Sequence, residues 1–243
     1  MENLAPAGNW DALRSAVAAG ADAVYLGYAA YSARAGAGNF DEQQLRDAVR
    51  FAHLHHVRVH VTVNTLIKDG EMAGVVDVLR LLSEIRVDAV LVQDLGVLRM
   101  ARRCFPDLPI HASTQMALHN AAGARLLQKL GAQRVVLARE LTLNEIREIA
   151  AIPGLETEAF IHGALCYSYS GLCMFSSLET GKSANRGKCL YPCRAAFGGC
   201  DGEKHYFSMK DMALQGEVLK MPVTSLKIEG RKKTALYVLS LIH

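Results

Sequence analysis

Residues 57–92 read VRVHVTVNTLIKDGEMAGVVDVLRLLSEIRVDAVLV. The run opens with β-branched residues over 57–63, which predict a buried strand. Apolar residues then recur at three- and four-residue steps over 72–85, which predicts an amphipathic helix, and Ala89–Val92 predicts a second strand. A strand, a helix and a strand in this order are typical of a βαβ unit, whose two strands lie parallel in one sheet.

The same alternation continues on both sides of this unit. Further strands are predicted at Asn3–Ala5, Ala23–Leu26, Pro109–His111, Arg134–Leu137, Glu158–Ile161 and Ser225–Ile228. Further helices are predicted at Trp10–Ala19, Glu42–Leu54, Val97–Cys104, Asn120–Leu130 and Leu143–Ala151. Eight strands with helices between most of them favour a (β/α)8 TIM-like barrel, one domain over residues 1–243. An open doubly wound sheet is the alternative, although Pro6-Ala7-Gly8-Asn9 lacks the glycine-rich turn of a dinucleotide-binding fold.

The composition is that of an ordinary globular protein. Hydrophobic residues make up 51% and charged residues 21% of the 243 residues, which argues against a disordered chain. No apolar run reaches the roughly 18 residues of a membrane helix, and no secretory signal is recognisable. We therefore expect a cytoplasmic protein with no membrane contact.

Charge is distributed unevenly along the chain. Residues 1–180 hold 16 Lys and Arg against 19 Asp and Glu, whereas residues 181–243 hold 11 against 5. A basic final quarter suggests an anionic partner, and nucleic acid is one such partner.

Polar side chains follow most of the predicted strands. In a parallel barrel the carboxyl ends of the strands meet at one rim, where such barrels carry their chemistry. The residues at these positions are Asn64, Gln93, Asp94, Ser113, Thr114, Gln115, Arg139, Glu140, His162, Lys227, Glu229 and Arg231. The sequence therefore predicts a functional site at this rim.

More than 60 residues separate the last two predicted strands, and they include a cysteine-rich insertion at about 163–206. Cys166, Cys173, Cys189 and Cys193 follow the spacing C-x6-C-x15-C-x3-C, and Cys200 is a possible substitute ligand. Four thiolates can hold an iron–sulfur cluster or zinc. The wide gaps favour the cluster, with structural zinc or unligated redox cysteines as alternatives.

Several stretches resemble the collagenase-like peptidase family U32. The most specific is Glu-Ala-Phe-Ile-His-Gly-Ala-Leu-Cys at 158–166, which continues to the Gly171-x-Cys173-x-x-Ser176-Ser177 stretch. The other matching stretches are Leu4–Asn9, Gly20–Tyr25, Arg134–Leu141 and Ser225–Arg231. The resemblance runs from residue 3 to about 238.

The resemblance implies a barrel and an oxygen-independent hydroxylase. Similar members hydroxylate a pyrimidine at its fifth carbon in tRNA or rRNA, and are thought to use prephenate and a 4Fe-4S cluster. By position, Cys166, Cys173, Cys189 and Cys193 inherit the cluster. The motifs Asn185-Arg186-Gly187-x-Cys189 and Pro192-Cys193-Arg194 look like the RNA-modifying branch. Other members act in pairs, so a partner subunit is possible.

Roles for single residues follow from this hypothesis. Prephenate is a dicarboxylate, and guanidinium groups bind carboxylates in bidentate fashion. We predict catalytic roles for Arg139, Gln115, Lys227 and Glu229, and substrate binding by Asn64, Arg34, Arg231 and His162. We expect RNA phosphates to contact Lys182, Arg186, Lys188 and Lys232.

Two other functions are weighed against RNA hydroxylation. A peptidase is the alternative that the family's traditional name suggests, but His-Glu-x-x-His is absent. Cys166 with His162 as its base is conceivable, and His53, His55, His56 and His60 are interpreted as solvated or core histidines. A scaffold that binds RNA or a partner has no need of the polar rim. Family members are longer, and Leu239–His243 resembles a foreign tail, so we expect a fragment whose last helix is truncated.

Overall fold

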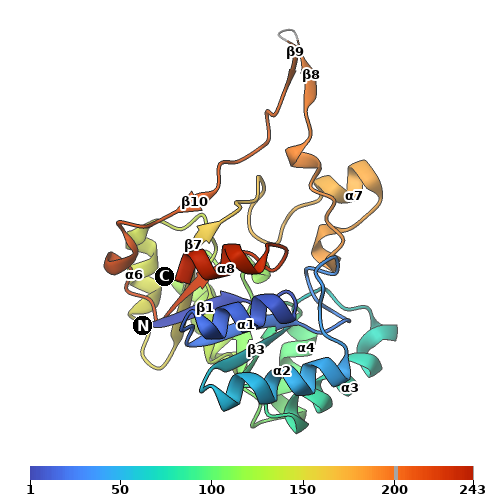
Figure 1. Ribbon diagram of the computed structural model, residues 1–243, viewed down its shortest axis with the longest axis vertical. Helices are drawn as coiled ribbons and strands as arrows, with labels where there is room; N and C mark the ends of the chain where they lie inside the picture. Colours follow the sequence, from blue (N-terminus) through green and yellow to red (C-terminus); the bar gives the residue numbers. More distant parts are fainter. Residues whose placement is uncertain (200–201, 243) are drawn as a thin grey trace.

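Eight parallel strands close into a barrel (Figure 1). The computed structural model describes residues 1–199 and 202–242. The barrel strands are β1 (Glu2–Pro6), β2 (Ala23–Gly27), β3 (Arg58–Val63), β4 (Ala89–Val92), β5 (Ile110–Ala112), β6 (Arg134–Val136), β7 (Glu156–Gly163) and β11 (Ser225–Ile228). Each pairs with the next, and β11 pairs with both β7 and β1. The predicted barrel is confirmed, and the open sheet is excluded.

Helices follow the strands around the outside of the barrel. They are α1 (Trp10–Ala18), α2 (Glu42–Leu54), α3 (Met72–Glu84), α4 (Leu95–Cys104), α5 (Ala121–Leu130), α6 (Leu143–Ala150) and α8 (Ala235–Ile242), whereas the short helix α7 (Phe175–Thr180) lies in the segment between β7 and β11. The side chains of Asn9 and Asp41 cap α1 and α2. The last helix, expected to be truncated, is as long as α6 and packs beside α1. None of the described helices is long and apolar enough to cross a membrane.

Alternate residues of each strand face the helices or the barrel interior. In β3, Val59, Val61 and Val63 join the main hydrophobic core. His60 and Thr62 lie between them in sequence and are also buried, so they face the inside of the barrel. The interior therefore carries buried polar groups, and the main apolar core lies between strands and helices.

An arm, residues 164–211, rises from the end of β7 (Figure 1). It contains α7, two short 3-10 turns and a hairpin of β8 (Phe197–Gly199) and β9 (Gly202–Lys204). The chain returns through β10 (Met212–Ala213), which pairs antiparallel with His162 and Gly163. This pairing extends β7 beyond its predicted end. Cys200 lies outside the described residues.

Candidate functional site

The mouth of the barrel, where the carboxyl ends of the strands meet, opens into two adjoining cavities. The larger has a volume of about 350 Å³ and runs under the arm. The smaller, about 40 Å³, lies at the strand ends. The residues that line both are Arg34, Thr114, Gln115, Arg139 and Glu229. The predicted rim residues Asn64, Lys227 and Arg231 line the smaller cavity.

Three guanidinium groups surround one carboxylate at this mouth. Arg34 Nη2 lies 3.3 Å and Arg139 Nη2 lies 3.6 Å from the carboxylate oxygens of Glu229. Burial alone would raise the pKa of Glu229, but Arg34, Arg139 and Arg231 hold it below its usual value. Glu229 is therefore ionised, and the three arginines leave an excess of positive charge.

Arg231 is the most deeply buried of the three, with 4% of its surface exposed. Its Nη1 donates to Thr62 Oγ1 at 3.0 Å and its Nη2 donates to Ser32 Oγ at 2.8 Å. Burial lowers the pKa of Arg231 to about 10. Room for the guanidinium depends on Gly27, because a Cβ there would lie 2.2 Å from Nη1. Both of these hydrogen bonds go to hydroxyls, and Glu229 is shared among three arginines, so burial of this cation is costly until a further anion joins it.

Arg139 connects the barrel to the arm. Its guanidinium stacks 4.0 Å from the centre of the Phe160 ring, and Nη1 donates to the carbonyl of Ala164 at 2.8 Å. Its Nε is buried and has no partner in the described part of the chain. One side chain thus contacts the cavity wall and the first residue of the arm.

Asn64 is already engaged in holding a loop. Its Oδ1 accepts from the backbone N–H of Ala33 at 3.0 Å, and its Nδ2 donates to Ser113 Oγ at 3.2 Å. These bonds fix the chain next to Arg34 against β5. The structure therefore gives Asn64 a role in shaping the cavity.

Lys227 faces inward and forms an ion pair with Glu158 at 2.7 Å. Its ammonium also lies 4.2 Å from the centre of the Tyr25 ring. Burial lowers the pKa of Lys227, although Glu158 opposes the change. The sequence predicted a catalytic role for Lys227, and in the structure the carboxylate of Glu158 holds its ammonium.

Glu158 belongs to a network of buried charges inside the barrel. Arg134 contacts Glu158 at 3.1 Å, Glu2 at 2.5 Å and Glu156 at 2.6 Å. Burial would raise the pKa values of Glu2 and Glu158, but their cationic partners keep both below the usual value.

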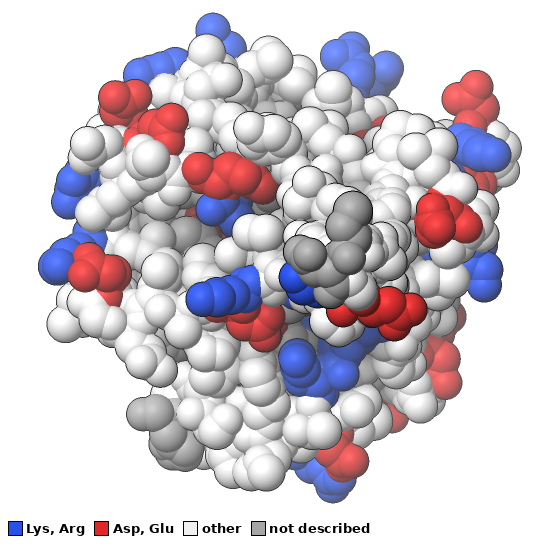
Figure 2. All heavy atoms as spheres, turned by 90° about the horizontal axis from the view of Figure 1, so that it is seen from above, with Lys and Arg blue, Asp and Glu red and all other residues white. Residues whose placement is uncertain are grey.

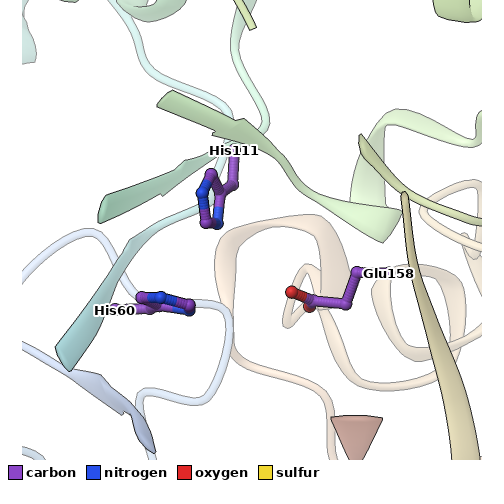
Figure 3. A group of neighbouring side chains, drawn as sticks. All are labelled: His60, His111 and Glu158. Carbon is purple, nitrogen blue, oxygen red and sulfur yellow. The ribbon is translucent and has the colours of Figure 1, made fainter. Parts of the chain in front are cut away.

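His60 and His111 lie beside this network, with ring centres 4.8 Å apart (Figure 3). Burial lowers the pKa of His60 to about 4 and that of His111 well below its usual value. Both imidazoles are therefore neutral near pH 7.

Two residues that the sequence predicted to contact ligands have other partners in the structure. His162 lines neither cavity, and its ring packs 6.1 Å from Tyr237 of α8. Arg186 forms a two-pronged ion pair with Glu71, at 2.9 and 2.5 Å, and donates to the Leu66 carbonyl. It therefore fastens the arm to the loop after β3.

The three lysines predicted to contact RNA phosphates lie in different places. Lys182 and Lys188 are exposed, whereas Lys232 lines the larger cavity.

Together with Gln115 and Arg139, the larger cavity is lined by Cys166, Cys173, Cys189 and Cys193. Partial burial, with the nearby Cys173, Cys193 and Cys189, raises the pKa of Cys166. Four thiols on one cavity wall are a suitable donor set for an iron–sulfur cluster or zinc, because either metal deprotonates its thiol ligands.

Two anchors hold the segments that carry these cysteines. Glu140 accepts from the backbone N–H of Ser170 at 2.9 Å, between Cys166 and Cys173. Arg194, next to Cys193, donates to the Leu165 carbonyl at 2.8 Å. Figure 2 looks down on this face and shows Lys and Arg around the arm, interspersed with Asp and Glu.

Several site residues escaped the sequence analysis. Tyr25, Phe160 and Ser32 shape the mouth, and His111 and Glu158 face the interior of the barrel. Their signals were weak, since each is a single polar or aromatic residue within an apolar strand or loop. Gly27, at the end of β2, is the signal in the sequence that could have indicated a close approach.

Comparison with known proteins places the site in context. The model of peptidase family U32 matches residues 8–243. The "tRNA hydroxylation protein P1" of Bacillus subtilis is 36% identical over 99% of this chain and 61% of its own length. A 23S rRNA 5-hydroxycytidine synthase of Escherichia coli is 40% identical over 98% of this chain and 37% of its own length. A collagenase of Porphyromonas gingivalis is 32% identical over 98% of this chain and 62% of its length.

The chain thus spans less than two thirds of these relatives. A solved U32 peptidase structure covers 96% of this chain with a TM-score of 0.67 and 13% sequence identity, and 94% of that structure is matched in return. At that identity the likeness supports the barrel fold alone.

Proposed function

The chain belongs to peptidase family U32, and from that premise we propose that it is the barrel part of an enzyme that hydroxylates RNA. Relatives that share 36 and 40% of its residues are named for tRNA hydroxylation and for 5-hydroxycytidine synthesis in rRNA. Both are matched over almost the whole of this chain. We propose a pyrimidine of tRNA or rRNA as the target and its fifth carbon as the site of hydroxylation.

One observation supports this function most strongly. A mouth with three guanidiniums around one carboxylate adjoins a cavity lined by four cysteines. The first feature suits a small polyanion, and the second suits a redox-active metal group. A hydroxylase that draws on an acidic co-substrate and moves electrons needs both features side by side.

The arginines would bind the co-substrate, for which we propose a dicarboxylate, prephenate. Arg231 would pair with one carboxylate, and Arg139, which reaches both cavities, with the other. Glu229 offsets part of the positive charge before the ligand enters. Phe160 and Tyr25 form apolar walls that exclude water, which strengthens each charge contact. Gln115 offers an amide donor and an acceptor where the cavities meet, suited to a pyrimidine edge.

Cys166, Cys173, Cys189 and Cys193 would hold a 4Fe-4S cluster. When bound, it would supply one-electron chemistry next to the mouth. Glu140 and Arg194 keep the cysteine-bearing segments in place through backbone contacts. Exposed Lys182 and Lys188 on the arm would contact RNA phosphates.

Peptidase activity has weaker support. Ser170 donates directly to Glu140 at 3.1 Å, and His119 Nε2 lies 3.2 Å from the same carboxylate. In a catalytic triad the histidine stands between serine and carboxylate, so this order is wrong for proton transfer from serine. His162 packs on Tyr237 of α8 and does not line the cavity that Cys166 lines.

The test is an anaerobic preparation examined by ultraviolet–visible spectroscopy, with iron and sulfide counts. We expect a brown protein with about four irons per chain, the content of one 4Fe-4S cluster, and loss of the colour in Cys173→Ser. Addition of prephenate and unmodified RNA should then give 5-hydroxypyrimidine by mass spectrometry. Stoichiometric zinc without iron would select the structural-zinc alternative and contradict the proposal.

A further inference from the structure

Three potential metal ligands meet inside the barrel, separate from both cavities. His60 comes from β3, His111 from β5 and Glu158 from β7, and their side chains converge on one point (Figure 3). One donor atom from each lies within 4.8 Å of the others. All three are buried, with 2, 5 and 0% of their surfaces exposed.

The two imidazoles lack the partners that buried polar groups usually have. Nδ1 of His60 and Nδ1 of His111 are both buried without a hydrogen bond in the described part of the chain. Most buried polar atoms in proteins are paired, so two unpartnered imidazole nitrogens on residues that lie beside one carboxylate need an explanation. The neighbouring Glu2, Arg134 and Ser225 are, by contrast, all hydrogen bonded.

We propose that His60, His111 and Glu158 bind one divalent transition-metal ion, with zinc as the reference ion. Two neutral imidazoles and a carboxylate form a donor set typical of zinc and of non-haem iron. Zinc bonds of about 2.0–2.2 Å require the donors to approach one another by roughly 1 Å. A side-chain rotation supplies such a shift.

The buried charges around the cluster determine which existing contact the ion must replace. Glu158 and Glu2 are anionic, and Lys227 and Arg134 are cationic, so the four buried charges balance before the metal enters. A carboxylate has about four lone-pair sites, and Lys227 and Arg134 occupy only two on Glu158. A metal on a third site would weaken the hold on Lys227, whose side chain also lines the smaller cavity. The ion would thereby tune the charge at the mouth.

The experiment counts zinc after the cysteines have been removed from competition. The full chain is expressed in zinc-supplemented medium, its exposed thiols are alkylated, and it is dialysed before elemental analysis. We expect one zinc per chain in this thiol-blocked protein and in the control His55→Gln, an exposed helix-end histidine. We expect His111→Gln to hold no zinc, because its zinc affinity should fall by more than about 100-fold. That loss exceeds the one expected for a residue that only hydrogen bonds to a metal ligand.

A second measurement does not depend on whether the variant folds. X-ray absorption at the zinc edge of thiol-blocked wild-type protein should show two imidazole ligands and no sulfur. Absence of zinc from that protein, retention of zinc by folded His111→Gln, or a spectrum without imidazole would each overturn the proposal. None of these outcomes depends on the cluster or on RNA hydroxylation.

Discussion

The inside of the barrel and its mouth hold similar charged residues in opposite balance. Inside, Glu2 and Glu158 face Arg134 and Lys227, so two carboxylates meet two buried cations. At the mouth, Glu229 is the one carboxylate among the described residues that faces Arg34, Arg139 and Arg231. The interior satisfies its own charges, whereas the mouth satisfies them only in part.

This difference separates structural charges from those that await a ligand. Removal of one member of a closed network costs much folding stability, because its partner remains buried and unpaired. At a site with surplus positive charge, removal of one arginine costs little folding stability. The effect of its removal appears in the affinity for the anion. Matched substitutions in the two regions therefore test which region binds the anion.

The largest expected effect is on folding, from Arg134→Met. This change leaves Glu2 and Glu158 without their shared cation and should lower the free energy of unfolding by about 3–5 kcal/mol. Urea unfolding measures it. The matched control is Arg231→Met, where Ser32 and Thr62 still bond each other at 2.9 Å, and its expected cost is less than about 1 kcal/mol. Equal losses in the two variants would refute the distinction.

The second effect is on binding. Arg139→Ala should cost about 2 to 4 kcal/mol of prephenate affinity, the scale for breaking a buried charge pair. RNA affinity should persist, since Lys182 and Lys188 lie on the arm. Calorimetry with prephenate and a salt-dependent RNA binding assay separate the two, with Lys182→Ala as the reciprocal control. If Arg139→Ala weakened both equally, or neither, the pocket would be misassigned.

Acid should destabilise the interior before the mouth. His60 has a folded pKa of about 4, and its unfolded pKa is about 6.5, so only the unfolded chain gains a proton between these values. Stability is complete above pH 6.5 and falls as the pH drops toward 4. From pH 7 to 5, His60 alone should cost about 2 kcal/mol, and His111 adds to it.

Unfolding at the two pH values, in a chelator, measures this loss. The control His56→Gln replaces an exposed histidine and should lose as much stability between pH 7 and pH 5 as the wild type. His60→Gln should lose less over the same interval. An unchanged pH dependence in His60→Gln would show that this imidazole is not the cause.

The smallest effect on global stability is expected at the base of the arm. Glu71→Gln breaks the ion pair with Arg186, but the pair is partly exposed and such pairs contribute little. Arg186 lowers the pKa of Glu71 to about 2. The contribution of the pair is therefore complete above the unfolded pKa of about 4.5 and is lost only as the pH falls toward 2.

Hydrogen exchange of residues 184–190 should increase in Glu71→Gln at pH 7. The same amides should stay protected in the wild type at pH 4. Faster exchange in the wild type at pH 4 would mean that another contact holds the arm.

The sequence predicted the barrel well because its signals are local. Glu42–Leu54, Ala89–Val92 and Ser225–Ile228 have the predicted bounds, since helical and strand periods and an Asp41 cap are contained in a few neighbouring residues. The arm was not predicted in detail. Its two strands, β8 and β9, are three residues long. The chain then returns through the two-residue β10, whose partner in β7 lies about 50 residues earlier.

Side-chain direction at the mouth was harder to predict for a specific reason. The pairing of β11 with β7 shifts register between Lys227 and Ile228. Lys227 pairs with Phe160, whereas the next residue, Ile228, pairs with His162. Such an irregularity changes which side chains face inward. The irregularity lies directly before His162, whose ring packs against Tyr237 of α8, whereas Lys227 precedes it and pairs with Glu158 inside the barrel.

Closure of the barrel by β1 against β11 has a consequence for synthesis on the ribosome. Glu2 Oε1 accepts from Ser225 Oγ, a partner 223 residues later in the chain. At roughly 5–20 residues per second, one edge of the nascent sheet stays open for about 10–45 s. During that interval Glu2 lacks its hydroxyl partner, and β1 exposes backbone N–H and C=O groups that are not yet paired. Other nascent chains can pair with such an open strand edge. Factors that shield a growing chain should therefore act on β1 until Ser225 emerges.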